Sequence, residues 1–290
     1  MIAIYEPIYM PGQSLNEPAF RPLTIENSDR AEWREFYILV DMYRRGLHRQ
    51  QMFTGLMSPK FRLKTKITGS QFIDFVRANV GADVCFINPF GHLAYVCYNV
   101  WMQGEASHPG LVLRAQELLD ASGIDLKLAD VPRHRPAVLC FCNFWVGTEK
   151  FWDDYVGGIL IPIAEFLEKN PDHSTSRSVL ATARYAEPVP FLPFIIERLF
   201  TTFLSLASRK IIARAYPLDP IQCCLNEFEK KIVTFRKEAI DAADRQDIFP
   251  DPLKRDMGFI CELWQSYNIA YYSDHPHPHT GACFPPEIAQ

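Results

Sequence analysis

The chain has 290 residues, of which 48% are apolar and 22% are charged, a balance typical of a globular protein with one large or two small domains. Its formal net charge is −4, so bulk charge gives no case for a nucleic-acid partner. The longest run without Asp, Glu, Lys or Arg, residues 84–104, is interrupted by Asn88, Pro89, His92 and Asn99, which disfavours a membrane-spanning helix.

Strand and helix patterns alternate along most of the chain, which predicts an α/β sheet flanked by helices. The predicted strands are residues 2–5, 51–57, 82–87 and the apolar run that starts at Leu139. The predicted helices are residues 29–45, 68–79, 94–102, 109–122, 149–169, 191–206, 226–245 and 257–267. Thr68 and Gln71 have the spacing of a capping box.

The remaining segments read as loops, and residues 170–190 are a candidate mobile loop. In the charged helix 226–245, the spacing places four residues inward: Phe228, Ile232, Phe235 and Ala239. We expect an α/β domain over residues 1–208, followed by a helical extension with an irregular tail over 209–290.

The eight cysteines form no Cys-x-x-Cys pair, and the first residues lack the basic segment of a signal peptide. We therefore expect reduced thiols and a cytoplasmic protein.

Polar residues follow predicted strands, where open α/β sheets bind ligands. Asp83 lies at the turn into the strand 82–87, Asn88 follows that strand, and Asn143 stands where the apolar strand from Leu139 ends. We expect Tyr5, residues 83–88 and Asn143 to lie near one cleft. Ser58, Lys60 and Lys64 lie in a basic loop that could hold a diphosphate through point charges, or that could simply be solvated.

Further along the chain, Gln103, Glu105 and His108 form a polar island before Pro109. His108 fits a base or a phosphate or hydroxyl binder, and it equally fits a helix cap. Glu197 and Arg198 lie beside the apolar stripe of their helix, as a surface ion pair or as a base beside a phosphate-binding arginine.

The tail carries alternating histidines, which an extended chain would place on one side to hold Zn²⁺ or Ni²⁺. These are His275, His277 and His279. The intervening prolines favour a disordered segment instead.

Short motifs between residues 34 and 204 occur in the order of a known family. They are Thr54-Gly55-Leu56, residues 83–89, residues 103–108, Cys142-Asn143-Phe144 with residues 151–155, and Glu197-Arg198-Leu199. Together they resemble a glycosyltransferase-like family of bacterial capsule and lipopolysaccharide biosynthesis clusters. The resemblance implies a GT-A-like (Rossmann-like), mainly parallel sheet. It also implies sugar transfer from a nucleotide-diphosphate donor to an oligosaccharide or lipid-linked glycan.

On this hypothesis, each candidate residue takes one of three roles. The catalytic residues are Glu197 and His108. The donor-binding residues are Tyr5, Ser58, Lys60, Lys64, Asp83, Asn88 and Arg198. The acceptor-binding residues are Gln103, Glu105, Asn143 and Trp145.

Many such transferases bind a divalent metal through Asp-x-Asp, but here Asp83 is followed by Val84 and Cys85. We therefore expect no required metal and leave Mn²⁺ or Mg²⁺ open, together with the oligomeric state and peripheral membrane association. The alternatives are a non-catalytic nucleotide- or glycan-binding protein on the same fold, and an oligomeric scaffold that assembles through the helix 226–245.

Overall fold

The computed structural model describes residues 1–25, 30–185, 187–207 and 210–285. It contains one mixed six-stranded sheet with the strand order β2-β1-β3-β5-β4-β6. The strands are β1 (Ile2–Ile8), β2 (Arg21–Thr24), β3 (Phe53–Leu56), β4 (Val84–Phe86), β5 (Trp145–Gly147) and β6 (Ala213–Ala215). Strand β1 is parallel to β2 and β3, and β4 is parallel to β6, whereas β5 is antiparallel to both of its neighbours.

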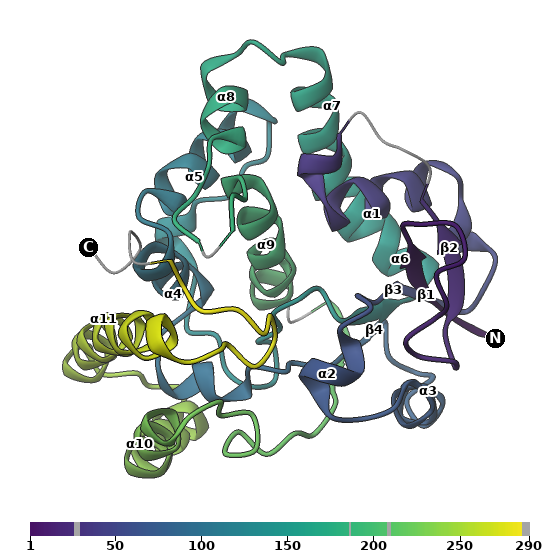
Figure 1. Cartoon of the computed structure of the whole chain (residues 1–290). Coiled ribbons are helices and arrows are strands. Elements are labelled where there is room, and N and C mark those ends of the chain that lie inside the picture. Colours follow the sequence, from purple (N-terminus) through teal and green to yellow (C-terminus); the bar gives the residue numbers. More distant parts are fainter. Residues whose placement is uncertain (26–29, 186, 208–209, 286–290) are drawn as a thin grey trace.

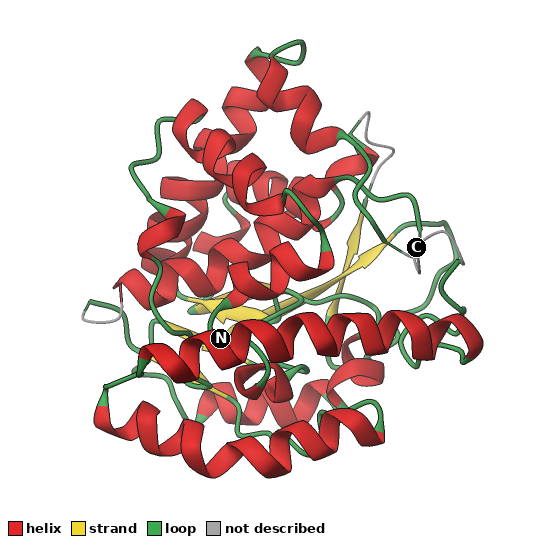
Figure 2. Cartoon of the chain, turned by 90° about the vertical axis from the view of Figure 1, so that its left-hand side faces the viewer, coloured by secondary structure: helices red, strands yellow, loops and turns green. Residues whose placement is uncertain are grey.

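Helices surround this sheet, and the two long C-terminal helices lie together beneath it in Figure 2. In chain order they are α1 (Glu35–Arg44), α2 (Phe61–Thr65), α3 (Gly69–Arg77), α4 (Val100–Ser107), α5 (Leu111–Ala121), α6 (Glu149–Trp152), α7 (Ile161–Lys169), α8 (Ser174–Leu180), α9 (Phe191–Ala207), α10 (Glu227–Gln246) and α11 (Asp251–Asp274). A π-helical segment, η5 (Asp153–Leu160), joins α6 to α7. Figure 1 shows α4, α5, α8 and α9 gathered on one side of the molecule and α1 and α7 on the other. The α/β fold is thus confirmed.

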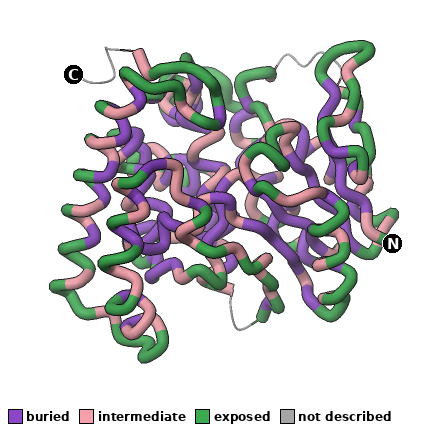
Figure 3. Tube along the Cα trace, turned by 60° about the horizontal axis from the view of Figure 1, so that its bottom comes forward, coloured by how far each residue is buried: buried purple, intermediate pink, exposed green. Residues whose placement is uncertain are grey.

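Both faces of the sheet are covered by apolar side chains. Val84 and Phe86 of β4 point into one buried cluster, whereas Cys85 between them points into a second cluster on the opposite face. In β5, Trp145 and Val146 divide in the same way. Figure 3 shows the resulting pattern, with buried segments towards the centre of the molecule and exposed residues towards its periphery.

Several local predictions are confirmed. The Thr68 side chain accepts from the backbone N–H of Gln71, and the Gln71 side chain accepts from the backbone N–H of Thr68, which completes the capping box of α3. Helix α9 covers the predicted segment 191–206, and Asn226 caps α10. The predicted helix start at Asp29 and the predicted boundary between residues 208 and 209 lie outside the described residues.

The expected strand at Leu139 was wrong in position. Strand β5 begins only at Trp145, after two consecutive residues with positive φ: Cys142 at 66° and Asn143 at 52°. This left-handed backbone turns the chain before the strand, so Asn143 precedes β5 instead of ending a strand.

Three further expectations also differ from the structure. The loop predicted at residues 170–190 contains α8, and the helix predicted to start at residue 94 starts at Val100. Phe235, predicted to point inward from α10, is 83% exposed. Strand β6, which follows residue 209, belongs to the same sheet as the strands of the N-terminal part.

Candidate functional site

A cavity of about 330 Å³ is lined by residues of the helices α4, α9 and α11 and of the segments that follow β3 and precede β5. It is lined by seven of the thirteen candidate donor-binding, acceptor-binding and catalytic residues: Ser58, Lys64, Gln103, His108, Asn143, Glu197 and Arg198. Residues from four distant parts of the chain therefore meet at one place, as expected for a ligand site.

The sheet explains why Ser58 and Asn143 meet there. Ser58 lies two residues after the end of β3, at Leu56. Trp145 at the start of β5 pairs with Phe86 at the end of β4, because these strands are antiparallel. The residues before β5 thus lie at the carboxyl ends of β3 and β4, which is where α/β sheets bind ligands.

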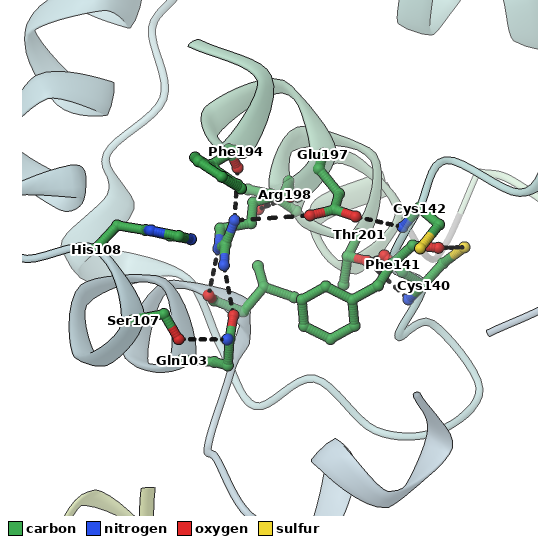
Figure 4. Close-up of polar contacts among 12 residues, drawn as sticks. Gln103, Ser107, His108, Cys140, Phe141, Cys142, Phe194, Glu197, Arg198 and Thr201 are labelled. Carbon is green, nitrogen blue, oxygen red and sulfur yellow. Dashed lines mark hydrogen bonds and ion pairs between the residues drawn. The ribbon is translucent and has the colours of Figure 1, made fainter. Parts of the chain in front are cut away.

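Glu197 lies at the centre of the polar residues around the cavity (Figure 4). Its Oε1 accepts from the backbone N–H of Cys142 at 2.6 Å, and its Oε2 lies 3.9 Å from Nη1 of Arg198. One turn further along α9, Thr201 exchanges two hydrogen bonds of 2.9 Å with the backbone of Cys140. Helix α9 therefore fixes the segment 140–142, and the side chain of Glu197 remains 24% exposed.

Arg198 is 2% exposed, although it carries a charge. Its Nε donates to the carbonyl of Val100 at 3.0 Å, its Nη1 donates to the carbonyl of Phe194 at 2.7 Å, and its Nη2 donates to Oε1 of Gln103. All three acceptors are neutral, so they satisfy the donors of the guanidinium without cancelling its charge. Arg198 is therefore a buried cation beside a carboxylate that faces the cavity, and the interpretation as a surface ion pair does not apply.

Lys64 comes from α2 and reaches the same region, where its Nζ lies 3.1 Å from Sγ of Cys142. Burial opposes the ammonium charge, but Cys142 and the carboxylate of Glu197 raise the pKa of Lys64 above its usual range. Burial also raises the pKa of the Cys142 thiol to about 12, although Lys64 acts in the opposite direction. At neutral pH the lysine is thus charged and the thiol is protonated, which argues against a nucleophilic cysteine.

His108 packs its ring on Phe194, with ring centres 3.8 Å apart, and its Nδ1 lies 2.8 Å from the carbonyl oxygen of Arg184. Burial lowers the pKa of His108 to about 3, and Arg198 adds to this effect. A neutral ring that donates from Nδ1 to a carbonyl keeps Nε2 as an acceptor. His108 can therefore receive a hydrogen bond from a ligand.

Asp83 does not join this site. Its carboxylate accepts from the backbone N–H of Ile212, and its carbonyl accepts from the backbone N–H of Thr148, at the start of β4 where Val84 pairs with Gly147. Asn143 lies at the other end of the same strand pair. The expectation that both residues border one cleft was wrong, because Asp83 precedes its strand.

Five other candidates also lie outside the cavity lining. Asn88 accepts from two backbone N–H groups, those of Phe90 and Phe141. Glu105 accepts from the first backbone N–H groups of α5, and thus caps that helix. Trp145 and Tyr5 are packed in the apolar core. The amine of Lys60 donates to the carbonyl oxygen of His279 at 3.1 Å.

The tail that carries the histidines folds back against the molecule, as the yellow segment after α11 shows in Figure 1. His277 stacks near Phe284 and lines the cavity, and His279 is 5% exposed and contacts Phe90. His275 instead stacks on Tyr271 of α11. The rings of His277 and His279 contact each other, with centres 5.4 Å apart, whereas His275 lies apart from them, so the three side chains do not converge on one point. The described part of the tail has defined packing.

Helix α11 supplies a wall of the cavity that the sequence interpretation did not anticipate. Its lining residues are Trp264, Gln265, Asn268, Ile269 and Tyr272. Their spacing of three to four residues was a usable signal, because polar residues recur on the apolar face of the helix. The lining residues Arg34, Glu35 and Tyr185 had no comparable signal.

One buried cluster has the residue types of a metal site, with ligand atoms of His92, Cys224 and Glu229 within 4.8 Å of one another. The carboxylate of Glu229, however, already accepts from Trp264, Asn268 and the backbone of Leu225. These hydrogen bonds account for a buried carboxylate without a metal.

Comparisons with protein-family models, curated proteins and solved structures give no match. Among the described helices, none is both long enough and apolar enough to cross a membrane. The family resemblance therefore stays a prediction from the sequence motifs.

Proposed function

We propose that this protein is a glycosyltransferase that moves a sugar from a nucleotide-diphosphate donor to a glycan acceptor in bacterial surface polysaccharide biosynthesis. The observation that carries the proposal is the partly exposed carboxylate of Glu197, which faces the cavity between Lys64 and Arg198. A transfer reaction of this kind needs a base near the acceptor hydroxyl and positive charge near the leaving diphosphate.

The roles of the residues follow from their atoms. Lys64 and Ser58 bind the diphosphate, and Oε2 of Glu197 takes the proton of the acceptor hydroxyl. That hydroxyl oxygen bonds to the anomeric carbon, whose bond to the diphosphate oxygen breaks, and the electron pair leaves with the diphosphate. His108 stays neutral and accepts a hydrogen bond from the acceptor through Nε2.

The strand directions support the GT-A-like, mainly parallel sheet of the proposal. The pairings imply that β1, β2, β3, β4 and β6 run in one direction, because β5 is antiparallel to both β3 and β4. The cavity lies near the carboxyl ends of β3 and β4, together with Ser58 and Asn143.

One observation favours the alternative of a non-catalytic nucleotide- or glycan-binding protein on this fold. Asp83, the only acid at the position of the family's Asp-x-Asp motif, holds the backbone of Ile212 instead of facing the cavity. Release of nucleoside diphosphate from UDP-, GDP- and dTDP-sugars, assayed with glycan acceptors, separates the two functions. We expect release that persists in EDTA. Binding without release would support the alternative, and activity that needs Mn²⁺ would contradict the metal-free mechanism.

A further inference from the structure

A chain of hydrogen bonds connects the buried arginine to helix α11. Nη2 of Arg198 donates to Oε1 of Gln103, and Nε2 of Gln103 donates to Oγ of Ser107 at 2.8 Å (Figure 4). The hydroxyl of Ser107 then donates to Oε1 of Gln265 at 2.8 Å. Gln103 and Ser107 are 7% and 8% exposed, so the chain runs through the protein interior.

The chain fixes the direction of the last amide. Because Oε1 of Gln265 accepts from Ser107, its NH₂ group is the end turned away from Ser107. Gln265 lines the cavity and is not fully buried. This NH₂ group donates no hydrogen bond within the described residues, so its donors are available to a ligand.

The positive charge of Arg198, where the hydrogen-bond chain starts, makes the NH₂ group of Gln265 a favourable place for an anion. Glu197 lies near two cations, Lys64 and Arg198, so the three side chains together keep one positive charge. Every bond from Arg198 to Gln265 points its donor in the same direction, and such chains polarise their members. Around the whole cavity, the four cationic lining residues Arg34, Lys64, Arg184 and Arg198 outnumber the three carboxylates of Glu35, Glu197 and Glu229.

The geometry of Glu197 places the Gln265 end of the hydrogen-bond chain on the acceptor side of the cavity. Oε1 is held by the segment next to Lys64, whereas Oε2 faces Arg198, where the chain begins. If Lys64 holds the donor, an acceptor that gives its proton to Oε2 approaches from the Arg198 side and meets α11.

We infer that Gln265 recognises an anionic oxygen of the acceptor, a carboxylate or a phosphate, so that the acceptor is an acidic sugar. The inference rests on the proposed transferase function, because that function divides the cavity into donor and acceptor sides. It assigns a role in substrate selection to the C-terminal helix.

The test compares dissociation constants of the full chain for three probes: glucuronic acid, glucose 6-phosphate and glucose. We expect the wild type to bind at least one acidic probe about tenfold more tightly than glucose, since hydrogen bonds to charged groups are the stronger ones. The relative affinities for the two acids identify the anionic group. Gln265→Glu keeps the acceptor for Ser107 but replaces the NH₂ group by a carboxylate oxygen, and it should abolish the preference.

Glu262→Gln, on an exposed position of the same helix, is the matched control and should keep the preference. If Gln265→Glu fails to fold, Gln265→Met removes the NH₂ group without adding charge. Equal affinities for all three probes, binding of none of them, or an unchanged preference in the folded Gln265 variant would overturn the inference. Donor binding, measured on the same samples with sugar nucleotides, shows separately whether the transferase proposal fails.

Discussion

Glu197 is the residue on which the proposed chemistry depends, and its structural role has to be separated from catalysis. Its Oε1 holds the backbone of Cys142, while its Oε2 faces Arg198 and the cavity. A glutamine can keep the first interaction but cannot accept a proton. The substitution Glu197→Gln therefore separates the two roles.

We predict that Glu197→Gln lowers the transfer rate by a factor of about 10²–10⁴, the usual contribution of a general base. Donor affinity and melting temperature should change little, because the base acts on the acceptor. Steady-state kinetics and thermal unfolding measure these effects. A variant that turns over like the wild type would remove Glu197 from the mechanism, and a variant that unfolds would assign it a structural role.

Gly104 gives the second prediction at this scale, because it permits the close approach of Arg198. A Cβ atom at Gly104 would lie 2.4 Å from Nε of Arg198 and 2.6 Å from Cδ2 of Leu111. We expect Gly104→Ala to destabilise the fold by about 1–3 kcal/mol, the usual cost of overpacking, in urea unfolding. The control is Gly81→Ala, where a Cβ meets nothing within 4 Å. Equal stability of the two variants would contradict the packing of Arg198.

At the scale of elements, the direction of β5 decides where the site lies. The apolar run around Asn143 correctly indicated a strand in this region and pointed to Asn143 as a site residue. The predicted strand, however, ended at Asn143 instead of starting after it. Asn143 nevertheless lies at the end of the sheet where ligands are expected, because β5 starts where β4 ends. Strand direction depends on pairings between residues about 60 positions apart, as with Phe86 and Trp145, and local periodicity carries no such information.

The same reason limits the prediction of individual site residues. Gln103 and His108 were identifiable as a polar island between apolar segments, Lys64 as part of a basic loop, and Glu197 and Arg198 as charged residues beside an apolar stripe. The burial of Arg198 was not, since an arginine beside an apolar stripe reads as a surface residue. Gln265 enters the site only because α11 packs against α4, a contact between residues more than 150 positions apart.

A substitution of Asp83 tests how β4 and β6 are held together, because its carboxylate accepts a hydrogen bond from the residue before β6. We predict that Asp83→Ala lowers the free energy of unfolding by about 1 kcal/mol, the typical value of one hydrogen bond. The affinity for the donor should stay unchanged, because Asp83 lies at the start of β4, and the cavity lies near the other end of this strand. Asp74→Ala, which removes only an exposed ion pair with Arg77, is the control. A large loss of donor binding in Asp83→Ala would restore Asp83 as a site residue.

At the scale of the whole molecule, buried neutral histidines make stability depend on pH. Burial lowers the pKa of His108, His134 and His279 from 6.5 to about 3, and nearby cations add to this effect. Between these values the unfolded chain binds more protons than the folded chain, so unfolding becomes easier as pH falls. The stability from these groups is complete above pH 6.5 and is lost progressively towards pH 3.

We therefore predict that the free energy of unfolding, measured by urea titration at several pH values, falls steadily below pH 6.5. His134 is the most informative position, because it is completely buried and its Nδ1 accepts from the backbone of Val100 at 3.2 Å. His134→Gln should fold less stably at neutral pH but show a weaker dependence on acid. A stability that is constant through this range would mean that these side chains are protonated in the fold.

The central claim is that the cavity binds the diphosphate of a sugar nucleotide through Lys64. The most direct measurement is the thermal stability of the wild type and of Lys64→Gln with UDP-, GDP- and dTDP-sugars, with a CMP-sugar as the monophosphate control. At about 100 times its dissociation constant, a diphosphate donor should stabilise the wild type by about 2.7 kcal/mol. The CMP-sugar should stabilise it less, and Lys64→Gln should lose most of the diphosphate effect. Absence of stabilisation by every diphosphate donor, or equal stabilisation of both proteins, would contradict the account.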